Sequence, residues 1–349
     1  MIRIYKCPSC GSYRVYSGKA GKMVCVHCGA EAAVEAVEQN ALQGKDLAVG
    51  PEGSDQAGNG LVELRCPSCG VTLFTKDDGF TAAATCPACS QATLIESRLS
   101  GEFRPKYLIP FVLDKKEAKE AFKAWSRKGR LTPGSFRTDA NLDKMKGVYV
   151  PAWFYTYTVN MAMSLDAEKK KTTKSGGVET TTKETYLVEL KTQATYEKVP
   201  FSAAESLPAQ SLEVIEPYDY TKLVDFALPY LSGFFAEKYH FTAEELSERV
   251  KEALKADLME ATKKEAVGYD SLTERDVQAG FMDGKTEYVY LPVWMLQYEY
   301  GRKKFPLYMN GQTGKIDGTL PVSRLKVLVI FGIVFAVVLI ALILLGRFC

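Results

Sequence analysis

Large apolar and polar residues alternate over two stretches in the middle of the chain, which predicts half-buried β-strands. From Tyr149 to Leu165 most odd-numbered positions carry aromatic, Val, Met or Leu side chains, while 156, 158, 160 and 164 are Thr, Asn or Ser. A second alternating run occupies 186–196. The residues between these runs, 166–185, are polar, so we expect an exposed, mobile hairpin loop there. We expect its lysines to be solvated, with contact to lipid head groups as the alternative.

Two other segments place apolar residues every three or four positions, which predicts amphipathic helices. Each follows a capping box, formed by Asp114 with Glu117 and by Thr242 with Glu245. The helical and strand patterns together predict an α+β body with antiparallel strands over residues 101–322.

This body contains an internal sequence repeat. The motif Tyr-x-Pro-x-Trp occurs at 149–153 and again at 290–294, and the segment 109–112 matches 228–231. Each half is therefore expected to consist of a short proline-containing segment, a helix and an aromatic strand. We expect both motifs to form core strands rather than ligand sites.

The last pattern is a stretch of 20 residues without charge or strongly polar groups, Val327 to Gly346. A helix of that length spans about 30 Å, the thickness of a bilayer core. We expect 323–349 to be a C-terminal transmembrane anchor, because a buried core helix of this length would carry a polar stripe. Basic residues precede it, and no apolar run precedes the first cysteines, so we expect a single-pass cell-membrane protein with a cytoplasmic N-terminal part. Cys349 is interpreted as a bystander thiol, with lipidation or a bond to a partner as the alternatives.

Composition adds cysteine chemistry to this picture. The chain has 349 residues, a net charge of +2 and nine cysteines. The small charge gives no general argument for nucleic acid or an acidic partner. Eight cysteines form Cys-x-x-Cys pairs, which without an export signal favours metal thiolates over disulfides. The eight expected ligands are Cys7, Cys10, Cys25 and Cys28 in one set, and Cys66, Cys69, Cys86 and Cys89 in the other.

The spacing of these pairs predicts two zinc ribbons, at 1–30 and 61–100. Gaps of 14 and 16 residues separate the pairs, so that two tight turns bring four sulfurs to one metal. Gly11 and Gly29 follow the turns of the first ribbon and Gly70 does so in the second, and we expect them to supply the positive φ that such turns need. Four thiolates would also accept iron, but closed structural sites of this kind favour Zn²⁺. His27 could replace a ligand, but Cys28 already completes the set. With no position left for water, both metals are expected to be structural.

The first ribbon is basic and rich in tyrosine, whereas the second has no basic bias. Nucleic-acid binding would need such charges and rings, which makes binding at the membrane through this ribbon the alternative function. A solvated surface or a protein-docking face is the other interpretation. The candidate basic residues are Arg3, Lys6, Arg14, Lys19 and Lys22, and the tyrosines are Tyr5, Tyr13 and Tyr16.

Residues 31–60 are small, acidic and glycine-rich, which predicts a flexible linker between the ribbons. Its first ten residues could extend the first ribbon as a short helix. The second ribbon is interpreted as a structural or protein-contact module.

We find no catalytic constellation in the sequence. Gly311-Gln-Thr-Gly314-Lys315 differs from a phosphate loop, because two residues rather than four separate the glycines and Ile316 follows the lysine. Asn310-Gly311 predicts a hairpin turn instead. We expect no enzyme, although a ligand site between the repeated halves stays an alternative.

Taken together, these features resemble the bacterial membrane-associated proteins described as TFIIB-type zinc ribbon-containing proteins. The resemblance includes the paired cysteines, the segments 109–125 and 147–153, Ile215–Tyr220, Tyr230–Tyr239 and Asn310–Lys315. It implies a bacterial source and bound zinc, and it implies no established activity. The sequence thus predicts a membrane-tethered cytoplasmic adaptor or scaffold that binds a protein partner.

Overall fold

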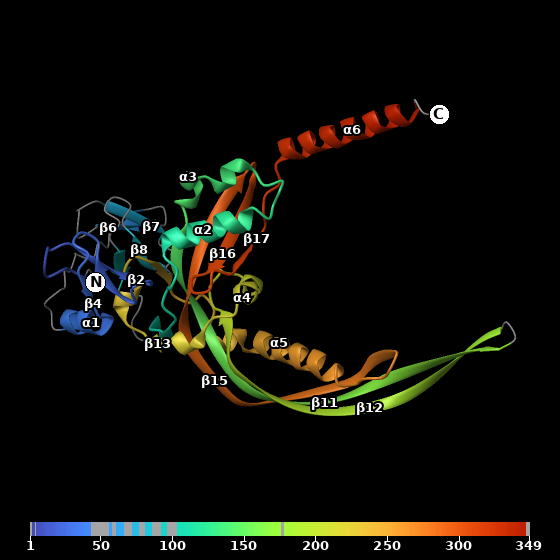
Figure 1. Ribbon diagram of the computed structural model, residues 1–349. Helices are drawn as coiled ribbons and strands as arrows, with labels where there is room; N and C mark the ends of the chain where they lie inside the picture. The colour runs from blue at the N-terminus through green and yellow to red at the C-terminus, as the bar shows by residue number, and fades with distance from the viewer. Residues whose placement is uncertain are drawn as a thin grey trace. The chain divides into compact units, whose positions relative to one another are not determined.

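The computed structural model describes residues 2–3, 5–42, 56–57, 61–65, 72–76, 81–85, 92–95, 103–175 and 178–346. It has the mixed α+β fold that the sequence predicts, and most of its strand pairs are antiparallel (Figure 1). The helices are α1 (Val34–Leu42), α2 (Lys115–Ser126), α3 (Asp139–Leu142), α4 (Ala209–Ile215), α5 (Ala243–Lys263) and α6 (Arg324–Gly346), with short 3-10 helices η3 (Gly134–Arg137), η4 (Tyr220–Lys222) and η5 (Leu228–Leu231).

The strands range from short pairs in the N-terminal part to very long strands in the body. They are β1 (Ile2–Arg3), β2 (Arg14–Ser17), β3 (Lys22–Cys25), β4 (Glu31–Ala32), β5 (Gln56–Ala57), β6 (Leu61–Arg65), β7 (Thr72–Lys76), β8 (Thr81–Thr85), β9 (Ala92–Ile95), β10 (Tyr107–Leu108), β11 (Lys146–Ser175), β12 (Val178–Ser202), β13 (Val224–Asp225), β14 (Phe235–Glu237), β15 (Ser271–Tyr300), β16 (Lys303–Asn310) and β17 (Ile316–Gly318).

The chain forms two compact units, and each is built from segments that are distant in sequence. Unit 1 contains Met1–Pro151, Ala204–Lys238 and Tyr290–Cys349, whereas unit 2 contains Ala152–Ala203 and Tyr239–Val289. Strands β11 and β15 contribute residues to both units. The compact units therefore do not follow the linear order of ribbon, body and anchor.

Unit 2 is a sheet of β12, β11 and the first part of β15, with α5 packed along one face (Figure 1). Strands β11 and β12 pair from Ala152↔Ser202 to Ser175↔Val178. On the covered face, alternate β11 side chains such as Val159 and Met161 are buried with Leu246, Val250 and other apolar residues of α5. This confirms the predicted alternation of buried and more exposed positions from Tyr155 to Leu165, whereas Val150, Ala152 and Phe154 show that both faces of the strand are buried before it.

The prediction of a loop over 166–185 is wrong, because the described residues 166–175 and 178–185 continue β11 and β12 as a regular ladder. Threonines favour extended backbone and pair across strands. Thr172 and Thr181 place their hydroxyl oxygens 3.3 Å apart, and Lys174 lies 3.6 Å from the carboxylate of Glu179. A hairpin segment whose side chains are polar and solvated therefore has the same composition as a loop.

Both predicted capping boxes form at the N-termini of α2 and α5. The residue before each N-cap is held in the same way: Trp294 Nε1 donates to Leu113 O at 3.2 Å within unit 1, and Trp153 Nε1 donates to Phe241 O at 2.9 Å within unit 2. The indole of each Tyr-x-Pro-x-Trp motif thus fixes the start of one helix. These matching contacts agree with the predicted repeat, which stays a prediction.

In unit 1 the N-terminal strands belong to the body. Strands β2, β3 and β4 form one small sheet and β5, β6 and β7 another. The hairpin β8–β9 joins the large sheet beside β14, which pairs in parallel with β11, and β1 pairs with β9. Residues 311–315 form the turn between β16 and β17, which confirms the predicted hairpin turn.

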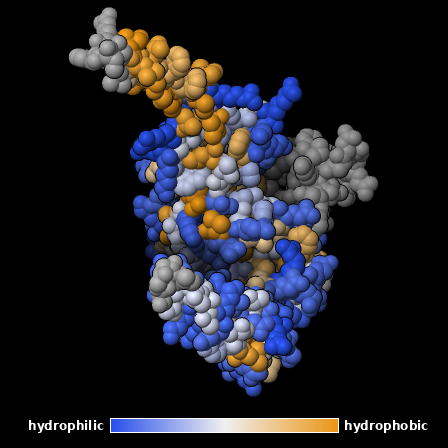
Figure 2. Space-filling view, turned by 90° about the vertical axis from the view of Figure 1, so that its right-hand side faces the viewer, coloured by the Kyte–Doolittle hydropathy of each residue, from blue (hydrophilic) through white to orange (hydrophobic). Residues whose placement is uncertain are grey.

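Helix α6 is the apolar C-terminal segment. An 18-residue window within Arg324–Ile343 has a mean hydropathy of 3.1 and none of that window is buried, so the helix is long and apolar enough to cross a membrane. Figure 2 shows that the visible face of this helix is apolar along its described length. The polar stripe expected of a buried core helix is absent from this helix.

Candidate metal centre

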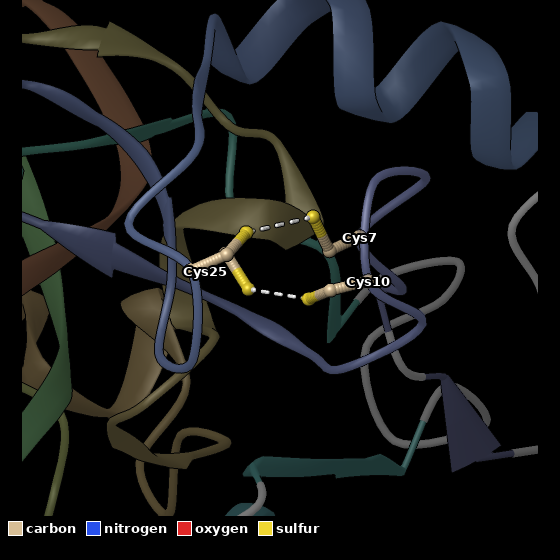
Figure 3. A group of neighbouring side chains, drawn as sticks. Cys7, Cys10 and Cys25 are labelled. Atoms are coloured by element: carbon tan, nitrogen blue, oxygen red, sulfur yellow. Dashed lines mark hydrogen bonds between the residues drawn. The ribbon is translucent and has the colours of Figure 1, made fainter.

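Four thiols meet near the N-terminus, at the end of β3 and in the turns on either side of β2 and β3 (Figure 3). Cys25 is the last residue of β3, and Cys28 follows in the next turn. Cys7 and Cys10 lie in the turn that the Lys6↔Tyr13 bridge closes before β2. The antiparallel pairing of β2 with β3 places Arg14 opposite Cys25 and so brings the two turns together.

The two turns have the same backbone geometry. In the first, the N–H of Gly11 donates to Cys7 O at 2.8 Å, and the N–H of Cys7 donates to Ser12 O at 2.6 Å. In the second, the N–H of Gly29 donates to Cys25 O at 3.1 Å, and the N–H of Cys25 donates to Ala30 O at 3.0 Å. Gly11 and Gly29 have φ of 73° and 71°, which confirms the positive φ predicted for them.

The distances between the sulfurs fit one tetrahedral metal ion. All four Sγ atoms lie within 4.8 Å of one another. Cys7 and Cys28 are 3.6 Å apart, and Cys10 and Cys25 are 3.5 Å apart. A tetrahedron with metal–sulfur bonds of about 2.3 Å has edges of about 3.8 Å, whereas a disulfide requires about 2.05 Å. The four residues could therefore hold a metal ion, and their arrangement is not that of two disulfides.

Thiol ionisation in this cluster also favours a cation. Desolvation opposes ionisation of Cys7, but the backbone N–H groups of Ser9 and Cys10 and the adjacent thiols outweigh it and lower its pKa to about 6. The backbone N–H of Cys28 is the main cause of a lowered pKa at Cys25. The backbone of Ser12 favours the Cys10 thiolate, but desolvation and the other thiols raise the Cys10 pKa to about 12. The backbone N–H groups thus stabilise thiolates in this cluster, whereas each further thiolate is opposed by those already present. A bound divalent cation would neutralise this negative charge.

Only the first of the two predicted cysteine sets lies within the described residues. Cys66, Cys69, Cys86 and Cys89 fall outside them, and so does Cys349. The strands that flank the second set are described, and they pair as β6–β7 and β8–β9. Two antiparallel hairpins are the framework that a zinc ribbon requires, and the second metal site stays a prediction. His27 is exposed, as expected of a residue outside the ligand set.

Part of the predicted basic and aromatic surface of the first ribbon faces the protein interior. Arg14, Tyr5 and Tyr16 are buried, with 6%, 2% and 7% of their surfaces exposed. Lys6 and Lys19 are exposed, and Lys22 forms an ion pair with Glu31 at 3.0 Å. Of Arg3, only the backbone is described, in β1. The residues that were grouped by composition therefore do not form one continuous face.

The buried side of the first ribbon docks on η5 and its flanks. The N–H of Tyr16 donates to Ser232 O at 3.0 Å, and the hydroxyl of Ser232 donates to Arg14 O at 2.9 Å. The rings of Tyr16 and Tyr230 meet edge to face with centroids 5.0 Å apart. Glu31–Leu42, expected at the start of a flexible linker, instead form β4 and α1, as the short-helix extension predicts, and bury Val34 and Val37.

A second cluster surrounds Glu216, for which the sequence alone predicts no role. Burial raises the pKa of its carboxyl to about 7, although Tyr220 donates to it at 3.2 Å and Lys315 lies nearby. The side-chain amide of Asn310 holds the same loop by donating to Ile215 O at 3.0 Å and Pro217 O at 3.2 Å. Through these contacts the turn Asn310–Lys315 holds the loop Ile215–Tyr220 in place. The two segments that carry the sequence resemblance are therefore neighbours in the fold. All of these groups are engaged with one another, so we read the cluster as structural.

Comparison with known proteins gives one relative of nearly equal length. The chain is 33% identical over 327 residues to a protein of Bacillus subtilis (strain 168) named "Uncharacterized protein YdjG", and the match covers 94% of this chain and 92% of the relative. It is therefore not confined to the cysteine-containing segments. No family model matches the chain, and no solved structure matches it.

Proposed function

We propose that this chain, which belongs to the same protein family as YdjG of Bacillus subtilis, is a membrane-tethered cytoplasmic scaffold that binds a protein partner. In this proposal α6 is the anchor and crosses the cell membrane once, and the basic residues before it keep the remaining chain in the cytoplasm. The zinc ribbons belong to the binding body and have a structural role.

One observation carries the partner-binding proposal: a long strand edge in unit 2. Strand β12 has 25 residues, against about 5–6 in an ordinary strand. Among the described strands it pairs only with β11. An unpaired edge presents backbone N–H and C=O groups that another chain can satisfy by adding a strand.

The side chains on this edge strand add an apolar contact. Tyr186 and Leu187 are 39% and 55% exposed, and they stand at the start of the apolar run that alternates along 186–196. Strand addition would supply affinity through the backbone, and these two side chains would supply specificity. A protein partner satisfies both requirements, whereas a small molecule satisfies neither.

We assign Zn²⁺ to the thiol cluster because four thiolates in a tetrahedral, closed arrangement suit this ion. The bound ion would cross-link the two turns and leave no position for water or substrate. We propose the same role for the second cysteine set, which gives two zinc ions per chain.

Photo-crosslinking of the full chain in its own membranes tests the scaffold proposal. A photoreactive amino acid at Leu187 should give one adduct of defined mass, whose second component also co-purifies with the unmodified chain. The matched control is Val267, which is 79% exposed in the same unit but lies outside the strands. If no adduct forms along β12 and repeated purification from membranes yields no stoichiometric protein, the proposal is wrong.

The same preparation separates this proposal from the nucleic-acid alternative. Binding of fluorescent DNA and RNA to the zinc-loaded full chain should be absent near physiological salt, because Arg14 and Tyr16 are occupied by the body. Micromolar binding that weakens with salt and depends on Lys6 and Lys19 would instead support nucleic-acid binding through the first ribbon.

A further inference from the structure

The body of unit 1 contacts the beginning of α6 through the loop that follows α2. The N–H of Ser323 donates to Leu131 O at 2.9 Å, and Lys326 Nζ donates to Thr132 O at 2.7 Å. The chain before the helix also packs closely here, because a Cβ on Gly129 would lie 2.6 Å from Leu320 Cδ1. Three contacts thus hold the loop beside the last residues before the apolar span.

These contacts set the depth of the loop relative to a bilayer. The apolar stretch from Val327 to Gly346 is just long enough to cross a hydrocarbon core of about 30 Å. Lys326 must then lie in the adjacent head-group layer, which is about 5–7 Å thick on each side. Since Ser323 is only about 4.5 Å further along the helix axis, Leu131 and Thr132 lie at the same level.

The loop carries exposed basic side chains at that level. Arg127, Lys128 and Arg130 are exposed and occupy four consecutive positions with Gly129. No acidic residue occurs between Ser126 and Thr138. The nearest acidic groups on α3 and its end are paired with α2: Asp139 lies 2.6 Å from Lys123, and Asp143 forms an ion pair with Lys119.

A fourth basic residue fixes the shape of this loop from inside. Arg137 donates through Nη2 to Ser126 O at 2.7 Å and to Gly129 O at 3.2 Å, and through Nε to Ser126 Oγ at 3.0 Å. Its guanidinium therefore closes the turn in which Arg127 and Lys128 point to solvent. The three exposed charges belong to a held loop and not to a solvated tail.

We propose that the loop Arg127–Arg130, together with Arg324, is a docking surface for anionic lipid head groups of the bilayer that α6 crosses. It rests on the proposed anchoring by α6, and it goes further by assigning the body its own contact with lipid. Anionic lipid phosphates supply the negative charge that the protein does not place beside these basic residues. The contacts to Ser323 and Lys326 keep the loop within reach of these phosphates.

Lipid selectivity of the full chain in reconstituted membranes tests this surface. Trace spin-labelled phosphatidylglycerol or phosphatidylcholine in phosphatidylcholine bilayers reports how much of each lipid the protein immobilises. At about 0.01 M salt, where the Debye length is about 30 Å, we expect immobilised phosphatidylglycerol to be preferred about fivefold. The preference should approach one at about 1 M salt, where that length is about 3 Å.

Neutralising the proposed surface should remove the preference while the anchor stays inserted. The variant R127Q/K128Q/R130Q/R324Q should show no preference at low salt, whereas the matched control K169Q/K170Q/K171Q/K174Q on β11 should keep it. An equal loss in both variants, or no preference in the unmodified chain, overturns the lipid surface. If the chain does not co-float with vesicles at all, the anchoring proposal fails instead.

Discussion

Replacing Gly18 with alanine tests whether the first ribbon is docked on the body of unit 1. An added Cβ would lie 2.7 Å from the carbonyl carbon of Phe111 and 2.9 Å from Val112 O. Since carbon atoms in contact prefer about 3.5–4.0 Å, the turn must withdraw by roughly 1 Å. Both neighbours are backbone atoms, so a rotamer change cannot relieve the clash.

The expected loss in the free energy of unfolding follows from the contacts of this interface. Two hydrogen bonds between the ribbon and Ser232 contribute about 1 kcal/mol each. The Tyr16–Tyr230 ring pair adds about 0.5–1.5 kcal/mol. Overpacking costs about 1–3 kcal/mol, so we expect a loss of about 2 kcal/mol, or about 4–8 °C in the unfolding midpoint.

Hydrogen exchange and thermal unfolding of the full, zinc-loaded chain measure this effect. The amide of Tyr16, which donates to Ser232 O, should exchange faster in Gly18→Ala while the metal content stays unchanged. Gly134→Ala is the control, because no atom lies within 4 Å of its added Cβ. If the two variants unfold and exchange alike, the ribbon is not docked as described.

Two further substitutions test the metal centre and the Glu216 cluster. Cys25→Ser should remove one metal ion per chain and unfold the first ribbon, because metal binding supplies most of its folding free energy, whereas Cys349→Ser should leave metal content unchanged; retained zinc in Cys25→Ser would show that the ligand assignment is wrong. The folded pKa of Glu216, about 7, lies above its ordinary value of 4.5, so the protonated carboxyl is favoured in the fold and stability falls as pH rises between these values. Glu216→Gln lacks this loss, and after screening by solvent it should be more stable than the unmodified chain by about 1–2 kcal/mol above pH 7 and equal to it near pH 4.5. A stability difference that does not change with pH would show that the Glu216 carboxyl does not titrate as described.

The features that the sequence predicts correctly are encoded within a few residues of each other. Both capping boxes, the positive φ of Gly11 and Gly29, and the turn after Asn310 depend on local chemistry. The four thiols follow the same logic, because each pair is local and only one strand pairing is needed to join them. The apolar span is equally local, since twenty consecutive residues specify it.

The hairpin was misjudged because composition does not distinguish a solvated loop from a solvated strand. Residues 166–185 have few large apolar side chains to bury, and β11 and β12 hold them through backbone pairing and cross-strand threonines. Their exposure is the property that the composition reported correctly. The step from exposure to a loop is the error, because a strand with two solvated faces is equally exposed.

The docking of the first ribbon could not be predicted, because its partners lie more than two hundred residues away. Ser232 and Arg14 are 218 positions apart, and no local pattern marks them as neighbours. A basic residue among tyrosines is expected both of a nucleic-acid surface and of a ribbon that packs its aromatic side against a protein. Burial of Tyr16 and Arg14 fits the second case. If a metal ion shapes the docked ribbon, it also stabilises η5, which the ribbon covers. Removing the metal with a chelator should therefore speed hydrogen exchange in η5 as well as in the ribbon.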